Sequence, residues 1–131
     1  LEFRRVLFRS NPPVVDESRS IAVGFDSANA TMTAFDIHED GTTSIRWQRT
    51  QGHGPHMVLY PDTGELVTHD HDLERMMEQV VVVDIETGAE RGRVDTGSPL
   101  MAPVFPAPGF GRDLYSCAFP GITRIWVEPE A

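Results

Sequence analysis

The sequence predicts an all-β fold built from repeats, and two observations lead to that prediction. Short runs rich in β-branched and aromatic residues alternate with polar residues along the chain, with no sustained apolar stripe at helical spacing. Turn sequences that contain glycine separate these runs: Asp40-Gly41, Asp62-Thr63-Gly64 and Glu86-Thr87-Gly88. Glycine takes the positive φ that a tight hairpin requires at little steric cost. We therefore expect antiparallel strands joined by hairpins.

The apolar runs define the expected strands. They cover residues 20–25, 31–37, 43–48, 57–60, 65–70, 80–85, 90–94, 101–105, 113–119 and 122–127. The best helical candidate is residues 73–78, and it is too short to be more than a turn in a loop.

Similar segments recur at regular intervals. Ile21-Ala22-Val23 aligns with Leu66-Val67-Thr68 and then with Leu114-Tyr115-Ser116, at separations of 45 and 48 residues. A second set aligns residues 34–37 with 82–85, again 48 residues apart, and more loosely with 125–128. Periods of this length are typical of propeller blades. The sequence thus predicts a partial β-propeller of about two to three four-stranded antiparallel blades.

The expected domain organisation has two parts. Residues 1–10 resemble the translation of a sequencing adapter, so we exclude them from the fold. Residues 11–131 form the incomplete propeller, with blades at about 14–50, 57–95 and 100–128. On this interpretation the natural N-terminus is missing, and a cytoplasmic and an exported location are both open. No apolar run approaches the length of a membrane span.

Several segments resemble the repeats of known propellers. They are Gly52-His53, the run from Met57 to Val67, and the run from Val82 to Gly88. Together they resemble WD-type, surface-layer (YVTN-type) and quinoprotein-like repeats, over nearly all of residues 20–128. The chain departs from these subfamilies where Val83-Asp84 replaces the Trp-Asp pair, so the resemblance implies the propeller superfamily and its fold. Propellers of this kind include scaffolds, lactonases, dehydrogenases and binding proteins.

Composition excludes one class of partner. The 131 residues carry 11 basic residues, all arginine, against 20 acidic residues, which gives a formal net charge of −9. Nucleic acid is not an expected partner, because its binding depends on neutralising phosphates with positive charge. The single cysteine, Cys117, cannot form an internal disulfide, and we interpret it as a small buried apolar residue.

Four histidines lie close together in the sequence: His53, His56, His69 and His71. On one strand, His69 and His71 point to the same face, which is a spacing that metal sites use. A third ligand would have to come from another histidine or from Asp70 or Asp72. The alternative is structural: His53 resembles the Gly-His of WD-type repeats, which ties a loop to its blade, and the other two end a half-exposed strand. We favour the structural interpretation and retain His69 and His71 as the metal candidates.

The acidic residues have simpler explanations. Asp36 and Asp84 occupy matching places before turns, so we expect both to accept hydrogen bonds from turn backbone. The acids between Glu65 and Glu74 lack the spacing of a known calcium loop. The sequence contains no glycine-rich phosphate cradle and no Gly-x-Ser-x-Gly nucleophile turn, so it identifies no catalytic residue.

These observations favour a non-enzymatic binding or scaffold module that is a fragment of a larger protein and presents loops to a protein or small-molecule partner. No cofactor is expected. The alternative is a propeller enzyme, a quinoprotein-like oxidoreductase or a lactonase-type hydrolase, with His56 or His69 near its site at the channel mouth. An incomplete propeller exposes inter-blade faces and a sheet edge, so we expect the isolated chain to self-associate.

Overall fold

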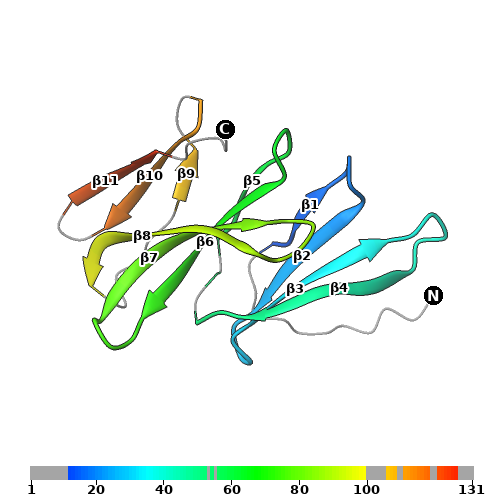
Figure 1. The fold of residues 1–131 in the computed structure, drawn as a ribbon, viewed down its shortest axis with the longest axis horizontal. Helices are drawn as coiled ribbons and strands as arrows, with labels where there is room; N and C mark the ends of the chain where they lie inside the picture. Colours follow the sequence, from blue (N-terminus) through cyan, green and yellow to red (C-terminus); the bar gives the residue numbers. More distant parts are fainter. Residues whose placement is uncertain are drawn as a thin grey trace.

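The computed structural model of the chain describes residues 12–52, 54, 56–99, 106–108, 111–118 and 121–126, and these residues form antiparallel sheets (Figure 1). The first sheet contains β1 (Val14–Asp16), β2 (Ile21–Asp26), β3 (Thr31–Ile37) and β4 (Thr43–Thr50). The second contains β5 (Val58–Tyr60), β6 (Glu65–Asp72), β7 (Met77–Asp84) and β8 (Glu90–Pro99). The third contains β9 (Pro106–Pro108), β10 (Asp113–Ala118) and β11 (Gly121–Trp126).

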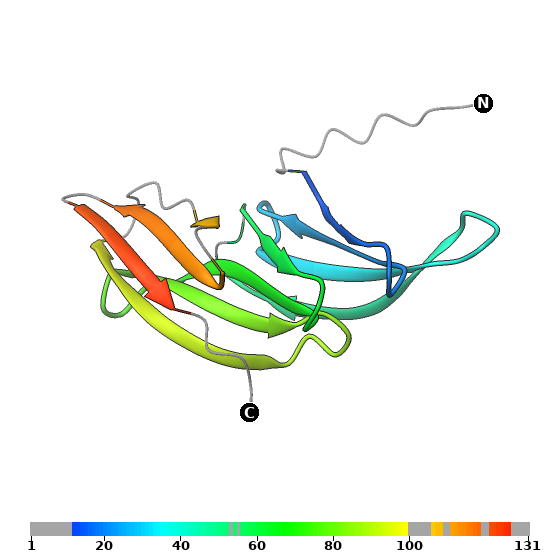
Figure 2. The ribbon, with the colours of Figure 1, turned by 90° about the horizontal axis from the view of Figure 1, so that it is seen from above.

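The three sheets stand in a row, as Figure 2 shows from above. Their short first strands are neighbours, since β1 contacts β5 and β5 contacts β9. The longer strands β4 and β8 lie at the opposite edges of their sheets. Strands in chain order, with the first strands gathered on one side, are the arrangement of consecutive propeller blades. The prediction of an all-β partial β-propeller is confirmed.

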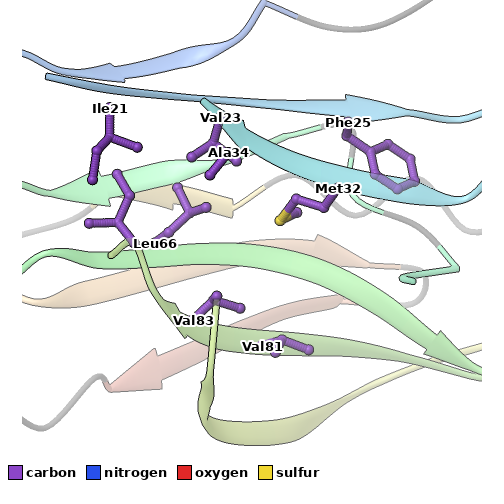
Figure 3. Close-up of a cluster of buried hydrophobic side chains, with 9 residues drawn as sticks. Ile21, Val23, Phe25, Met32, Ala34, Leu66, Val81 and Val83 are labelled. Carbon is purple, nitrogen blue, oxygen red and sulfur yellow. The ribbon is translucent and has the colours of Figure 1, made fainter. Parts of the chain in front are cut away.

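Two apolar cores lie between adjacent sheets. The larger lies between the first and second sheets (Figure 3) and contains Ile21, Val23, Phe25, Met32, Ala34, Leu66, Val81, Val83 and Ile85. The smaller joins the second sheet to the third and contains Val67, Val80, Leu114 and Ile125. Because side chains alternate along a strand, neighbouring residues of β6 serve different cores. Leu66 and Val67 therefore face opposite sheets.

Strand pairing corrects one repeat alignment. Ile21 pairs with Asp36 at the end of β3, and Glu65 pairs with Asp84 at the end of β7. Ile21 therefore corresponds to Glu65, 44 residues later, and the predicted separation of 45 residues is wrong by one. The apolar pattern misled the alignment because Glu65, which is only 2% exposed, is an acid at a place where the first sheet has isoleucine.

Some elements differ from the sequence prediction. β1 was not expected, since it has only three residues and follows two prolines. β7 begins at Met77, three residues before the predicted start. The strand expected at residues 101–105 and the segment 1–10 lie outside the described residues.

The two aspartates that were expected in turns have different roles. Asp84 accepts backbone hydrogen bonds from Glu86 at 2.8 Å and Thr87 at 2.9 Å, which confirms its turn role. For Asp36 the prediction is wrong, because its carboxylate binds the guanidinium of Arg46 at 2.8 Å. The turn between β3 and β4 instead uses Asp40, which accepts from the backbone and the hydroxyl of Thr42. Asp40 lies four positions after Asp36, and it can close this turn because more residues separate Phe35 from its partner Ile45 than separate Val83 from its partner Glu90.

Candidate functional site at the end of strand β6

The metal candidate His69 is fully buried within the second sheet. It pairs with Val80, as Phe25 in the first sheet pairs with Met32. His69 thus occupies the place of Phe25, and alternation along β6 puts it on the same face as Val67, toward the third sheet. The half-exposed position expected for this residue is wrong, because β6 continues to Asp72 and its end lies beyond His69.

His71 lies on the connection between the first two sheets. A Cβ atom at Gly52 would come within 2.7 Å of Cε1 of the His71 ring, so the ring covers the backbone of Gly52. His56 is half-buried just before β5, and His53 lies outside the described residues. The structure therefore brings His71 to the loop that joins β4 to β5, while His69 lies within the sheet stack.

Asp70 and Gln51 hold this connecting loop against β6. Asp70 Oδ1 accepts hydrogen bonds from the backbone N–H groups of Gly52 at 2.9 Å and His71 at 2.8 Å. The buried amide of Gln51 donates to the carbonyl oxygen of His69 at 2.7 Å. These bonds satisfy the backbone N–H of Gly52 and attach the loop to β6.

A chain of charges crosses from the first sheet to the second beside this loop. Asp70 Oδ2 lies 3.0 Å from Nη1 of Arg93, and the same nitrogen donates to Oε1 of Gln79 at 2.6 Å. Arg93 also binds the carboxylate of Glu90, which accepts a further bond from Arg49 on β4 at 3.1 Å. The hydrogen bonds from Arg93, and secondarily from Arg49, hold the pKa of Glu90 below its usual value although burial opposes them. This network links the sheets.

Arg75 ties the hairpin between β6 and β7 to Asp72 and to the neighbouring strand β8. Asp72 accepts hydrogen bonds from the backbone N–H groups of Glu74 and Arg75, each at 3.0 Å. The guanidinium of Arg75 also binds both carboxylate oxygens of Asp95 on β8, at 2.7 and 2.8 Å. This bidentate pair, with a bond from Gln79, lowers the pKa of Asp95 to about 2.

Two large apolar side chains project from this hairpin. Leu73 is 67% exposed and Met76 is 56% exposed. The backbone of Met76 has a φ of 52°, a left-handed conformation that is uncommon outside glycine, asparagine and aspartate. The hairpin thus presents apolar groups on a backbone whose shape is set by carboxylates and Arg75.

Three of the four acids considered as calcium ligands face an arginine. Glu65 pairs with Arg112, Asp70 with Arg93, and Asp72 with Arg75, as shown by their ion pairs. Within the part of the chain that the structure describes, no group of three or more His, Cys, Asp or Glu side chains is placed to hold a metal ion. Metal binding by His69 and His71 remains a prediction.

Sequence reasoning missed the arginines and the exposed hairpin. Arg75 binds Asp95 and Arg93 binds Asp70, each on another strand, so strand pairing is needed to bring these partners together. The hairpin did carry a signal, because Leu73 and Met76 are apolar residues inside a polar turn sequence.

Substituting His69 tests whether its role is structural. His69→Phe is expected to change the free energy of unfolding by less than about 1.5 kcal/mol, since Phe25 fills the corresponding place in the first sheet. His69→Ala is expected to lower it by about 2 kcal/mol or more, because it leaves a cavity. Urea unfolding followed by circular dichroism measures both. Zinc that stabilises the unmodified protein but has no effect on His69→Phe would instead support the metal role.

The chain was compared with protein families, curated sequences and solved structures. No protein-family model and no curated protein sequence matches it. Its structure is similar to the β-propeller domain of the Trilobed protease from Pyrococcus furiosus, which is described as having an open velcro topology. The TM-score is 0.46 and the identity 8% over 90% of this chain, and the chain spans 43% of the length of that one. No helix among the described residues has the length and apolar character needed to cross a membrane.

Proposed function

We propose that the chain is part of a non-enzymatic propeller module that binds a protein partner through the hairpin between β6 and β7. The observation that carries this proposal is the exposure of Leu73 and Met76 on a hairpin held by Asp72 and Arg75. Methionine is enriched in protein interfaces, and a backbone already held in shape loses little entropy on binding. The hairpin therefore suits a partner with an apolar pocket.

The surrounding charges favour binding over catalysis. A general acid or base has to come within hydrogen-bond reach of a substrate. Asp70, Glu90 and Arg93 instead contact one another and Arg49, and these contacts join the two sheets. Their placement supports a role in holding the hairpin and the connecting loop in position.

The test compares capture of a partner by the unmodified chain and by the double variant Leu73→Ser/Met76→Ser. Val94→Ser is the control, because Val94 is an exposed apolar side chain, at 46%, that lies on β8 and outside the hairpin. A protein recovered from lysate is purified and titrated against all three chains. Loss of two apolar anchors is expected to weaken its binding at least about tenfold, which corresponds to about 1.4 kcal/mol.

Two results would contradict the proposal. Equal affinity for the double variant and the control would remove the hairpin from the binding surface. Stoichiometric metal or quinone in the purified full-length protein would favour the alternative enzyme, a quinoprotein-like oxidoreductase or lactonase-type hydrolase.

A further inference from the structure

Each sheet has two different faces, and successive sheets always pack with the same two kinds of face in contact. We call the face toward the next sheet in the chain the forward face and the opposite one the backward face. The forward face of the first sheet, with Val23 and Met32, packs on the backward face of the second, with Leu66 and Val83. The forward face of the second sheet packs on the backward face of the third in the smaller core. The same pair of faces thus meets twice within one chain.

The backward face of the first sheet carries an apolar row that is exposed at both ends. Val15 pairs with Ala22, Ala22 with Phe35, and Phe35 with Ile45, so these residues form one row across all four strands. Val15 is 49% exposed and Ile45 is 58% exposed. Ile37, next to this row, is 36% exposed.

The corresponding row in the second sheet is covered by the first sheet. Leu59 pairs with Leu66, and Leu66 with Val83, in the register of Val15, Ala22 and Phe35. Leu66 and Val83 are fully buried in the core against the first sheet, and Leu59 packs on that core. The exposed row of the first sheet has the same register and similar apolar residues, so it is suited to pack against another sheet.

The forward face of the third sheet is the other exposed end. By alternation it carries Tyr115, Ile122, Arg124 and Trp126. Ile122 is 71% exposed and Trp126 is 56% exposed. The guanidinium carbon of Arg124 lies 5.6 Å from the centroid of the Trp126 ring. Large apolar and aromatic side chains thus gather at this end as well.

One oxygen of a buried carboxylate at the forward face also lacks a donor among the described residues. Asp113 is 3% exposed, and its Oδ2 accepts a hydrogen bond from Arg124 at 2.6 Å. Its Oδ1 is buried and has no hydrogen-bond partner among the described residues. Glu65, which begins β6 as Asp113 begins β10, receives Arg112 from the following sheet. A sheet packed on this face would bring a donor to Asp113 in the same way.

We propose that the forward face of the third sheet docks on the backward face of the first sheet of a second copy of this chain. The chain makes the same forward-to-backward contact twice between its own sheets. One forward face and one backward face remain exposed on each molecule, so a second copy offers the face that each of them fits. A head-to-tail contact of this kind closes into a ring when its rotation fits. Two copies of three sheets each make a ring of six, within the range of four to eight blades that propellers use.

The test measures mass in solution by size-exclusion chromatography with light scattering. The unmodified chain is expected to have twice the mass of one chain. The ring of two copies contains the same contact twice. Val15→Glu on the first sheet and Ile122→Glu on the third each place a charge in both of these contacts. Each variant is therefore expected to have the mass of one chain. Val94→Glu, with a side chain of similar exposure on β8 and outside both faces, is expected to leave it unchanged.

Mixing the two disrupted variants distinguishes a head-to-tail contact from a contact between identical faces. The Ile122→Glu chain keeps an intact first sheet and the Val15→Glu chain keeps an intact third sheet, so the mixture is expected to recover a two-chain species through one contact. A monomeric unmodified chain, a series of larger species, or a mixture that stays monomeric would each overturn the proposed two-copy ring.

Discussion

Leu66→Ala is expected to lower the free energy of unfolding by about 2–5 kcal/mol, because a buried leucine replaced by alanine loses apolar contact and leaves a cavity. Leu66 has no exposed surface and lies between the first two sheets with Val23 and Val83 (Figure 3). The neighbouring side chains belong to paired strands, so they cannot move far enough to fill the space. Urea unfolding followed by circular dichroism measures the change.

Leu73→Ala is the matched control, since it removes the same atoms from a side chain that is 67% exposed. Its free energy of unfolding is expected to stay within about 0.5 kcal/mol of the unmodified chain. Similar losses for the two variants would mean that the core between the sheets contributes little to stability, and would contradict the packing described above.

The fold was predictable because its main determinants are local or periodic. The alternation of apolar residues in β2 identifies this strand and the face on which Ile21 and Val23 lie. The turn sequences predict hairpins with glycine at positive φ, and Gly64 has a φ of 68°. The three-residue β1 was missed because so short a run shows no period.

The candidate site was less predictable, because it depends on contacts between distant residues. The burial of His69 follows from the third sheet that covers β6, and nothing within residues 65–72 signals that cover. The network of Asp70, Arg93 and Arg49 joins three strands of two sheets. Charged residues at such separations pair only once the register of the strands is set.

Arg112→Ala is expected to lower the free energy of unfolding by about 3–5 kcal/mol, because it leaves a buried carboxylate without its main partner. Glu65 is 2% exposed, and its carboxylate pairs with Arg112 from the third sheet and, at 3.8 Å, with Arg91. The guanidinium of Arg112 also lies 4.6 Å from the centroid of the Tyr60 ring, so the variant loses a cation–π contact as well. Urea unfolding measures the combined loss.

The double variant Glu65→Ile/Arg112→Met separates the buried charge from the rest of the contact. Isoleucine is the residue that the first sheet has at the place of Glu65, since Ile21 is buried there in an apolar core. Replacing a buried ion pair with apolar residues of similar size is often neutral or stabilising. We therefore expect the double variant to unfold at a urea concentration equal to or above that of the unmodified chain, although Arg112→Ala alone unfolds much earlier. If the double variant is as unstable as Arg112→Ala, the ion pair itself holds the second and third sheets together, and the repeat does not accept an apolar residue at this place in every sheet.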